Sequence, residues 1–108
     1  MLKKTIILII SILLLTTALK AKENIMILKL KDGDVKIKLF PDVAPNHVKR
    51  ITELANSGKY DGVVFHRVID GFMAQTGDVQ FGNSSSDNFN LSRAGMGGSD
   101  LPDLKEEF

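Results

Sequence analysis

The most informative segment of the sequence is Phe65-His66-Arg67-Val68-Ile69-Asp70-Gly71-Phe72-Met73-Ala74-Gln75-Thr76-Gly77-Asp78. Two apolar runs, Val63–Ile69 and Phe72–Gln75, flank its Asp-Gly pair, and that arrangement predicts a β-hairpin. Side chains alternate along a strand, so Arg67 is expected to share a face with Phe65 and Ile69. The stretch therefore predicts a guanidinium that lies beside aromatic and aliphatic side chains.

A second hairpin and one helix are predicted upstream. Ile25–Leu30 and Val35–Phe40 are apolar-rich runs around Asp32-Gly33-Asp34, which predicts a hairpin of two strands. Apolar residues at helical spacing, a proline in the first turn and a Ser-Gly stop then predict a helix over about 45–57. From Val79 to Phe108 small, polar and Gly-rich segments follow one another, so we expect little regular structure there.

The N-terminal residues have the three parts of a secretory signal. Met1–Lys4 is short and basic, Thr5–Leu19 is uncharged and dominated by Ile and Leu, and small residues follow up to Ala21. The uncharged run has 15 residues, fewer than the roughly 20 that a helix needs to span a bilayer. We therefore expect residues 1–21 to be a signal peptide or a retained N-terminal anchor, and the chain to be exported.

Charge and cysteine content exclude several classes of function. Removing residues 1–21 takes away three of the 14 basic residues, which leaves 11 against 13 acidic residues and a net charge of −2. Nucleic acid is therefore not an expected partner, since its binding depends on clustered Lys and Arg. The chain has no cysteine, which excludes a disulfide scaffold, a zinc knuckle, a thiol nucleophile and a lipoprotein anchor.

The predicted hairpin suits a reaction that needs no nucleophile, metal or cofactor. Neither serine nor cysteine occurs in residues 65–78, and the two histidines, His47 and His66, are too few for a zinc or iron site. His66 is expected to face away from Arg67 and to be structural. A fixed arginine beside an apolar pocket can bind a peptide carbonyl and stabilise a twisted amide, whose rotation is otherwise opposed by about 18–20 kcal/mol. These residues indicate conformational catalysis on X–Pro bonds, which interconvert slowly unaided.

The same stretch resembles the signature of the cyclophilin-type peptidyl-prolyl isomerases. Its flanks are similar as well: Ala44-Pro45 opens a helix, residues 58–62 lead into the strand, and residues 95–104 are similar to a loop of short bacterial cyclophilins. The resemblance runs from about Ile25 to Phe108. It implies that Arg67 is the catalytic residue, that Phe72 and Met73 line the proline pocket, and that Gln75 contacts the substrate backbone or steadies Arg67.

The resemblance also implies the fold class. We expect a mainly β fold with one helix, a partial cyclophilin-like antiparallel β-barrel, preceded by an N-terminal hydrophobic signal or anchor helix. Cyclophilins are closed eight-stranded barrels capped by two helices, and residues 22–108 match about the first half. We therefore expect a cyclophilin-like domain truncated in its C-terminal half, or one that needs a complementing C-terminal chain.

Three functions remain open at this point. The first is an exported, periplasmic prolyl isomerase that acts without a cofactor on proline-containing unfolded or partly folded proteins. The second is a truncated, inactive cyclophilin fragment that at most binds extended or apolar peptide. The third is a β module anchored in a membrane, which requires that Thr5–Leu19 is not cleaved.

Overall fold

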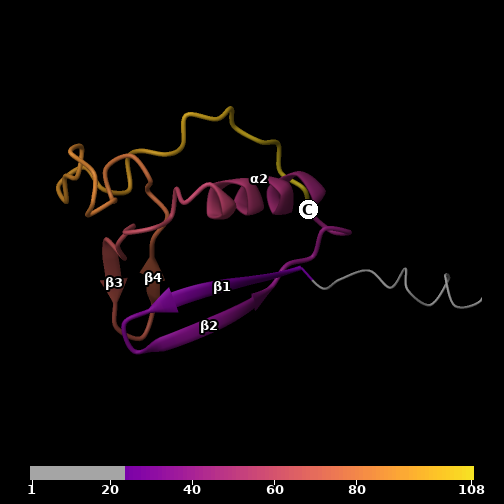
Figure 1. Cartoon of the computed structure of the whole chain (residues 1–108), viewed down its shortest axis with the longest axis horizontal. Coiled ribbons are helices and arrows are strands. Elements are labelled where there is room, and N and C mark those ends of the chain that lie inside the picture. Colours follow the sequence, from indigo (N-terminus) through magenta and orange to yellow (C-terminus); the bar gives the residue numbers. More distant parts are fainter. Residues whose placement is uncertain (1–23) are drawn as a thin grey trace, which may run out of the picture. The chain divides into compact units, whose positions relative to one another are not determined.

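The computed structural model describes residues 24–108, so the signal or anchor predicted over residues 1–21 lies outside the described part. The described part divides into two compact units, the first ending at Leu39 and the second formed by Phe40–Phe108. Within the described part no helix is both long and apolar enough to cross a membrane. The elements in chain order are β1 (Ile25–Leu30), β2 (Gly33–Lys38), α2 (Pro45–Asn56), β3 (Arg67–Ile69) and β4 (Met73–Gln75) (Figure 1).

In the first unit, β1 and β2 form the predicted antiparallel hairpin. The second strand was expected over Val35–Phe40 but begins two residues earlier, because Gly33 pairs with Leu30 and the turn shortens to residues 31–32. Cross-strand pairing puts apolar side chains of both strands on one face, where they stabilise the hairpin. This face carries Met26, Leu28, Val35 and Ile37.

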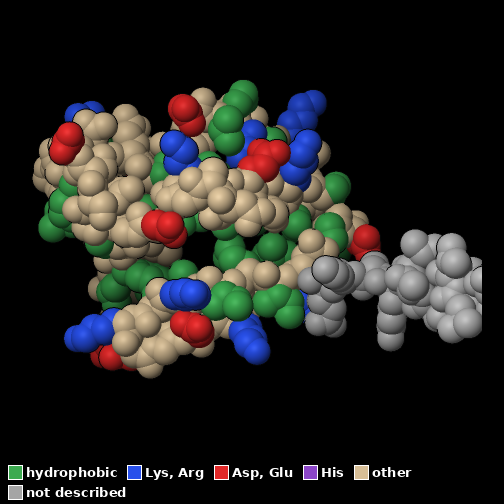
Figure 2. Space-filling view, in the orientation of Figure 1, with side chains coloured by type: hydrophobic (Ala, Val, Ile, Leu, Met, Phe, Trp, Pro, Cys, Tyr) green, Lys and Arg blue, Asp and Glu red, His purple; other side chains and the backbone are tan. Residues whose placement is uncertain are grey.

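The opposite face of this hairpin mixes apolar and charged side chains. Ile25 pairs with Lys38, and Ile27 pairs with Lys36. The two isoleucines keep 47% and 49% of their surface exposed, and Figure 2 shows apolar side chains among the charged ones on this hairpin. The face that carries Lys36 and Lys38 is therefore not polar throughout.

In the second unit, α2 begins at Pro45 and ends at Asn56, close to the predicted bounds. Proline at the first helical position costs no hydrogen bond there, and Leu54 anchors the helix as a buried side chain that is 8% exposed. The N–H of Lys59 donates to the Leu54 carbonyl at 3.0 Å, and the N–H of Gly58 donates to the carbonyl of Ala55 at 3.1 Å. With φ of 76° at Gly58, these two bonds make a Schellman motif that ends the helix as predicted.

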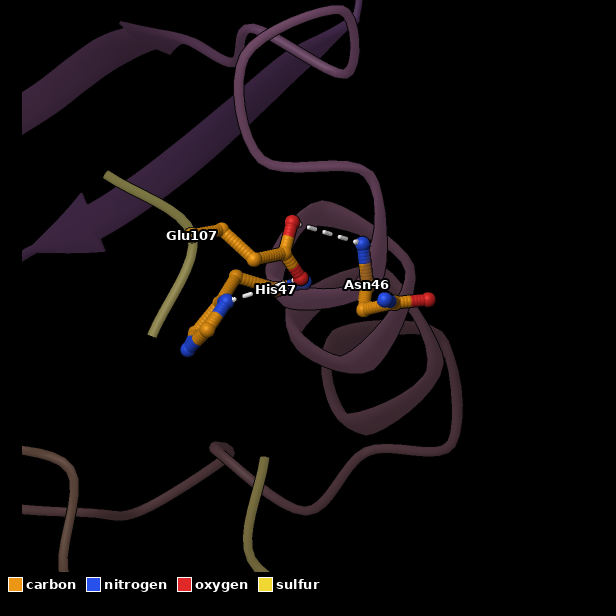
Figure 3. A network of polar contacts seen from close by, with 3 residues as sticks. All are labelled: Asn46, His47 and Glu107. Atoms are coloured by element: carbon orange, nitrogen blue, oxygen red, sulfur yellow. Dashed lines mark hydrogen bonds and ion pairs between the residues drawn. The ribbon is translucent and has the colours of Figure 1, made fainter. Parts of the chain in front are cut away.

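The other end of α2 is capped by a residue from far along the chain. The N-cap residue makes no side-chain cap, and the first turn has no acidic residue. Glu107 instead accepts hydrogen bonds from the N–H of Asn46 at 3.2 Å and of His47 at 3.1 Å, and it lies 3.0 Å from Nδ1 of His47 (Figure 3). Arg50 Nη1 also donates to the Pro102 carbonyl at 2.7 Å. These contacts hold the C-terminal segment beside α2.

The second hairpin, β3–β4, is shorter than expected. The strand predicted over Val63–Ile69 is reduced to its last three residues, because Val64 bonds outside the hairpin. Its N–H donates to the Gly82 carbonyl at 2.9 Å, and its own carbonyl accepts the Thr76 hydroxyl at 2.8 Å. Within residues 24–108 the strands therefore form two separate two-stranded sheets, and the expected partial barrel is seen only as these two antiparallel pairs.

Candidate functional site

The β3–β4 hairpin brings three of the predicted site residues onto one face. Arg67 pairs directly with Gln75, and Ile69 pairs with Met73. Because residues two apart in a strand share a face, Arg67, Met73 and Gln75 lie on the same side as Ile69. Arg67 is exposed, whereas Met73 and Gln75 are half-buried. A cationic donor and an amide thus lie next to an aliphatic and thioether surface.

The fourth predicted residue, Phe72, lies in the turn rather than in the strand that was expected over Phe72–Gln75. Its N–H donates to the Ile69 carbonyl at 3.0 Å. This bond closes the turn around Asp70 and Gly71, and Gly71 adopts the positive φ, 69°, that a type II turn needs at this position. The Phe72 side chain is 78% exposed, so the ring is open to solvent at the turn.

Directly after β4, the buried residue Asp78 organises the neighbouring loops. It is 4% exposed. Its Oδ1 accepts the N–H groups of Gln80 and Phe81, both at 2.9 Å, and its Oδ2 accepts those of Gly95 at 2.7 Å and Gly97 at 3.0 Å. Burial acts to raise the pKa of Asp78, but the four backbone hydrogen bonds outweigh it and hold the pKa below its usual value near 3.8. A charged carboxylate therefore ties two loop segments together.

His66 lies under the glycine-rich loop and next to Arg67 in the sequence. Both of its ring nitrogens are buried, and neither has a hydrogen-bond partner among residues 24–108. A Cβ at Gly95, where φ is 98°, would come within 2.9 Å of the His66 Nε2 atom. Only glycine lets the loop approach the ring this closely. The loop around Gly95, which Asp78 holds, therefore packs against His66, the residue before Arg67.

The chemistry available at the hairpin depends on Arg67. In the described part of the chain, no three His, Cys, Asp or Glu side chains lie close enough together to hold a metal ion. A guanidinium carries five N–H donors and no acceptor, so Arg67 can donate to a peptide carbonyl or to an amide nitrogen. Met73 and Ile69 supply apolar surface on the same face. This geometry suits binding an amide and polarising it.

The structural role of Asp78 was missed by sequence reasoning, which took this residue only as the end of the motif. A signal was present, since the carboxylate precedes a long segment with little predicted regular structure. The backbone N–H groups of such a segment need acceptors when they are buried. Glycines at positions 95 and 97 are the residues that let their N–H groups approach a carboxylate closely.

Comparison with known proteins identifies relatives over most of the described part. The family model described as cyclophilin type peptidyl-prolyl cis-trans isomerase/CLD matches residues 25–107. A protein of Brucella suis biovar 1 (strain 1330) named probable peptidyl-prolyl cis-trans isomerase is 60% identical over 86 residues, which are 80% of this chain and 43% of the relative. A putative peptidyl-prolyl cis-trans isomerase of Staphylococcus haemolyticus (strain JCSC1435) is 44% identical over 68 residues, 55% of this chain and 34% of the relative.

The match covers only part of these relatives. The chain spans about two fifths of the length of the Brucella proteins and about a third of the Staphylococcus protein. No solved structure matches the chain. The residues matched by the family model, 25–107, include the β3–β4 hairpin and the Asp78 loops.

Proposed function

Because the chain belongs to the cyclophilin-type peptidyl-prolyl cis-trans isomerases, we propose that it accelerates cis/trans isomerisation of X–Pro bonds. The observation that carries the proposal is the register of β3–β4. It sets Arg67 opposite Gln75 and puts Met73 on the same face. A donor for the amide and an apolar surface for the proline ring thus lie together.

Arg67 supplies the rate enhancement in this proposal. In the planar amide the nitrogen lone pair is delocalised, and in the twisted amide it is released and accepts a hydrogen bond from the guanidinium. The bond is therefore formed in the transition state and not in the ground state, which is the condition for catalysis. A hydrogen bond to a charged group contributes about 1.5–3 kcal/mol, which corresponds to roughly a tenfold to hundredfold acceleration.

The remaining site residues bind the substrate. Met73, half-buried on the Arg67 face, offers apolar surface to the proline ring. Gln75 carries both a donor and an acceptor beside Arg67, so it can bind the peptide backbone or orient the guanidinium. Phe72 is exposed at the turn and is available to cover the proline ring once a peptide is bound.

The proposed substrates are unfolded or partly folded exported proteins, and the proposed location is the periplasm. Export of the chain is supported by its short basic segment Met1–Lys4, the uncharged run Thr5–Leu19 and the small residues up to Ala21. The mature charge of −2 and the absence of a clustered basic patch in the sequence favour a polypeptide substrate over a nucleic acid.

A second candidate function is peptide binding without catalysis. Its support is the exposure of apolar side chains on the β3–β4 hairpin, where Val68 is 67% exposed and Phe72 is 78% exposed. Such surfaces bind extended or apolar peptide segments. In this case Arg67 would be an ordinary exposed residue of a binding surface.

The test compares isomerisation of an X–Pro peptide by the full 108-residue chain and by its Arg67→Ala variant. Lys49→Ala, which removes another exposed cation of the second unit, is the matched control. We expect acceleration by the native chain and by the control, and a loss of ten- to hundredfold in kcat/KM for Arg67→Ala. Peptide binding without any acceleration would favour the second candidate, and equal activity of all three chains would contradict the role of Arg67.

A further inference from the structure

A polar cavity of about 590 Å³ lies in the second unit, apart from the predicted site residues. Its walls come from three segments: the end of α2 at residues 57–59, the turn region within residues 79–86, and residues 98–100. None of Arg67, Phe72, Met73 and Gln75 lines it. The volume is within the range of about 300–1,000 Å³ that is usual for ligand pockets.

The walls of this cavity are held in place before any ligand binds. The Schellman motif fixes the segment after α2, with the N–H of Lys59 bonded to the Leu54 carbonyl. Asp78 fixes the other two walls. It accepts the N–H of Gln80, which lies in the wall formed by residues 79–86, and the N–H of Gly97, which precedes the wall formed by residues 98–100. A preformed pocket loses little free energy to ordering when it binds.

The lining indicates what kind of ligand fits. Its side chains are mostly hydroxyls and amides, with one cation, Lys59, and one anion, Asp100. The ends of the Lys59, Gln80 and Asp100 side chains have no hydrogen-bond or ion-pair partner within residues 24–108. Donors and acceptors are therefore both unused, and the two charges balance. An extended polypeptide, which offers alternating N–H and C=O groups, matches this lining, whereas a polyanion does not.

The cavity lies within reach of a peptide bound at Arg67. Gln75, opposite Arg67, precedes the cavity residue Val79 by four positions. Four residues of chain span at most about 14 Å, so four or five residues of extended substrate bridge the two places. We infer that this cavity is a second peptide subsite, which binds the backbone of the substrate several residues from the proline. The inference rests on the proposed function.

Gly98 is a position at which a larger side chain can be added to the lining of the cavity. It lines the cavity, its φ is not positive, and a Cβ placed on it meets nothing within 4 Å. Gly98→Phe therefore adds a large apolar side chain to the lining of the cavity. Leu91→Phe, at a position that is 64% exposed and outside the lining, is the matched control.

The experiment measures binding of three peptides to the full chain and to both variants. The first is a tetrapeptide with one X–Pro bond, and the others add five Gly, Ser and Asn residues to its N-terminal or its C-terminal end. We expect the tetrapeptide to bind all three chains alike. At least one extended peptide should bind Gly98→Phe fivefold or more weakly than it binds Leu91→Phe. Equal binding of both extended peptides to the two variants would overturn the subsite.

A second readout keeps the inference testable if Gly98→Phe does not fold. In the native chain, the backbone NMR signals of Lys59, Gln80 and Gly98 should shift with an extended peptide and not with the tetrapeptide. If these signals stay in place at saturation, the subsite is contradicted. Both readouts measure binding and not catalysis. If an extended peptide binds in the cavity but its X–Pro bond is not isomerised faster, the proposed function is contradicted and the subsite is not.

Discussion

Replacing Asp78 by Asn tests how far one buried carboxylate holds the loops of the second unit. The native side chain accepts four backbone N–H groups with its two oxygens. Asparagine keeps one oxygen and turns an NH₂ group toward two of these donors. Two charge-assisted hydrogen bonds, each of about 1.5–3 kcal/mol, are lost. Removal of the buried charge, which costs free energy to desolvate, offsets part of this loss.

We therefore expect the variant to lose about 3 kcal/mol of local stability. This is on the order of a hundredfold in the equilibrium for opening the loop. Amide hydrogen exchange in the full chain measures it directly at Gly95 and Gly97, whose N–H groups bond to Asp78. Asp87→Asn, at an exposed aspartate of the same loop region, is the control. Exchange at both glycines within threefold of the native rate would show that Asp78 does not hold the loop.

The effect of Asp78 also has a defined pH dependence. Its pKa is lowered in the folded chain, so its contribution to stability is fully present above the unfolded pKa, near 3.8. It is lost as the pH falls through the lower folded pKa. The difference in exchange between the native chain and Asp78→Asn should therefore shrink below about pH 4. A difference that stays constant from pH 7 to pH 2 would show that the charge is not the cause.

Two further substitutions test other contacts of the second unit. Gly95→Ala should destabilise the loop by about 1–3 kcal/mol, because φ is 98° and the new Cβ would lie 2.9 Å from the His66 ring. Thermal unfolding measures this loss. The control Gly98→Ala should show none, because its Cβ meets nothing within 4 Å. Glu107→Gln should weaken the cap of α2 by about 1 kcal/mol. Amide exchange at His47 should then be about fivefold faster. The control Glu106→Gln, at an exposed position, should leave this exchange rate unchanged.

Local signals predicted the elements well. The Asp-Gly pairs gave both hairpins, and the proline at position 45 with the Ser57-Gly58 stop gave α2 to within one residue. The strand expected over Val63–Ile69 was wrong in its first four residues. Its apolar composition indicates burial but not the pairing partner, and Val64 bonds with Gly82 and Thr76 instead. The amino-acid composition of a strand does not indicate which residues it bonds to.

The long-range contacts of the second unit could not be predicted in the same way. Asp78 bonds to Gly95 and Gly97 across 17 and 19 residues, and no periodicity links these positions. Alternation along a strand is a local rule, so Arg67 was correctly predicted to share a face with Ile69. Met73 and Gln75 lie on that face because of the register of the hairpin. The roles of these residues and of Phe72 stay predictions until the isomerase assay is made.

The cap supplied by Glu107 bears on the order in which the chain folds. Glu107 follows His47 by 60 residues, and closing a loop of that length costs about 4 kcal/mol in chain entropy. A chain made from its N-terminus presents all of α2 before the residue that caps it. The cap of the first turn can therefore be made only after residue 107 is free to return. A protein proposed to speed a slow folding step in others thus has a late, long-range step in its own folding.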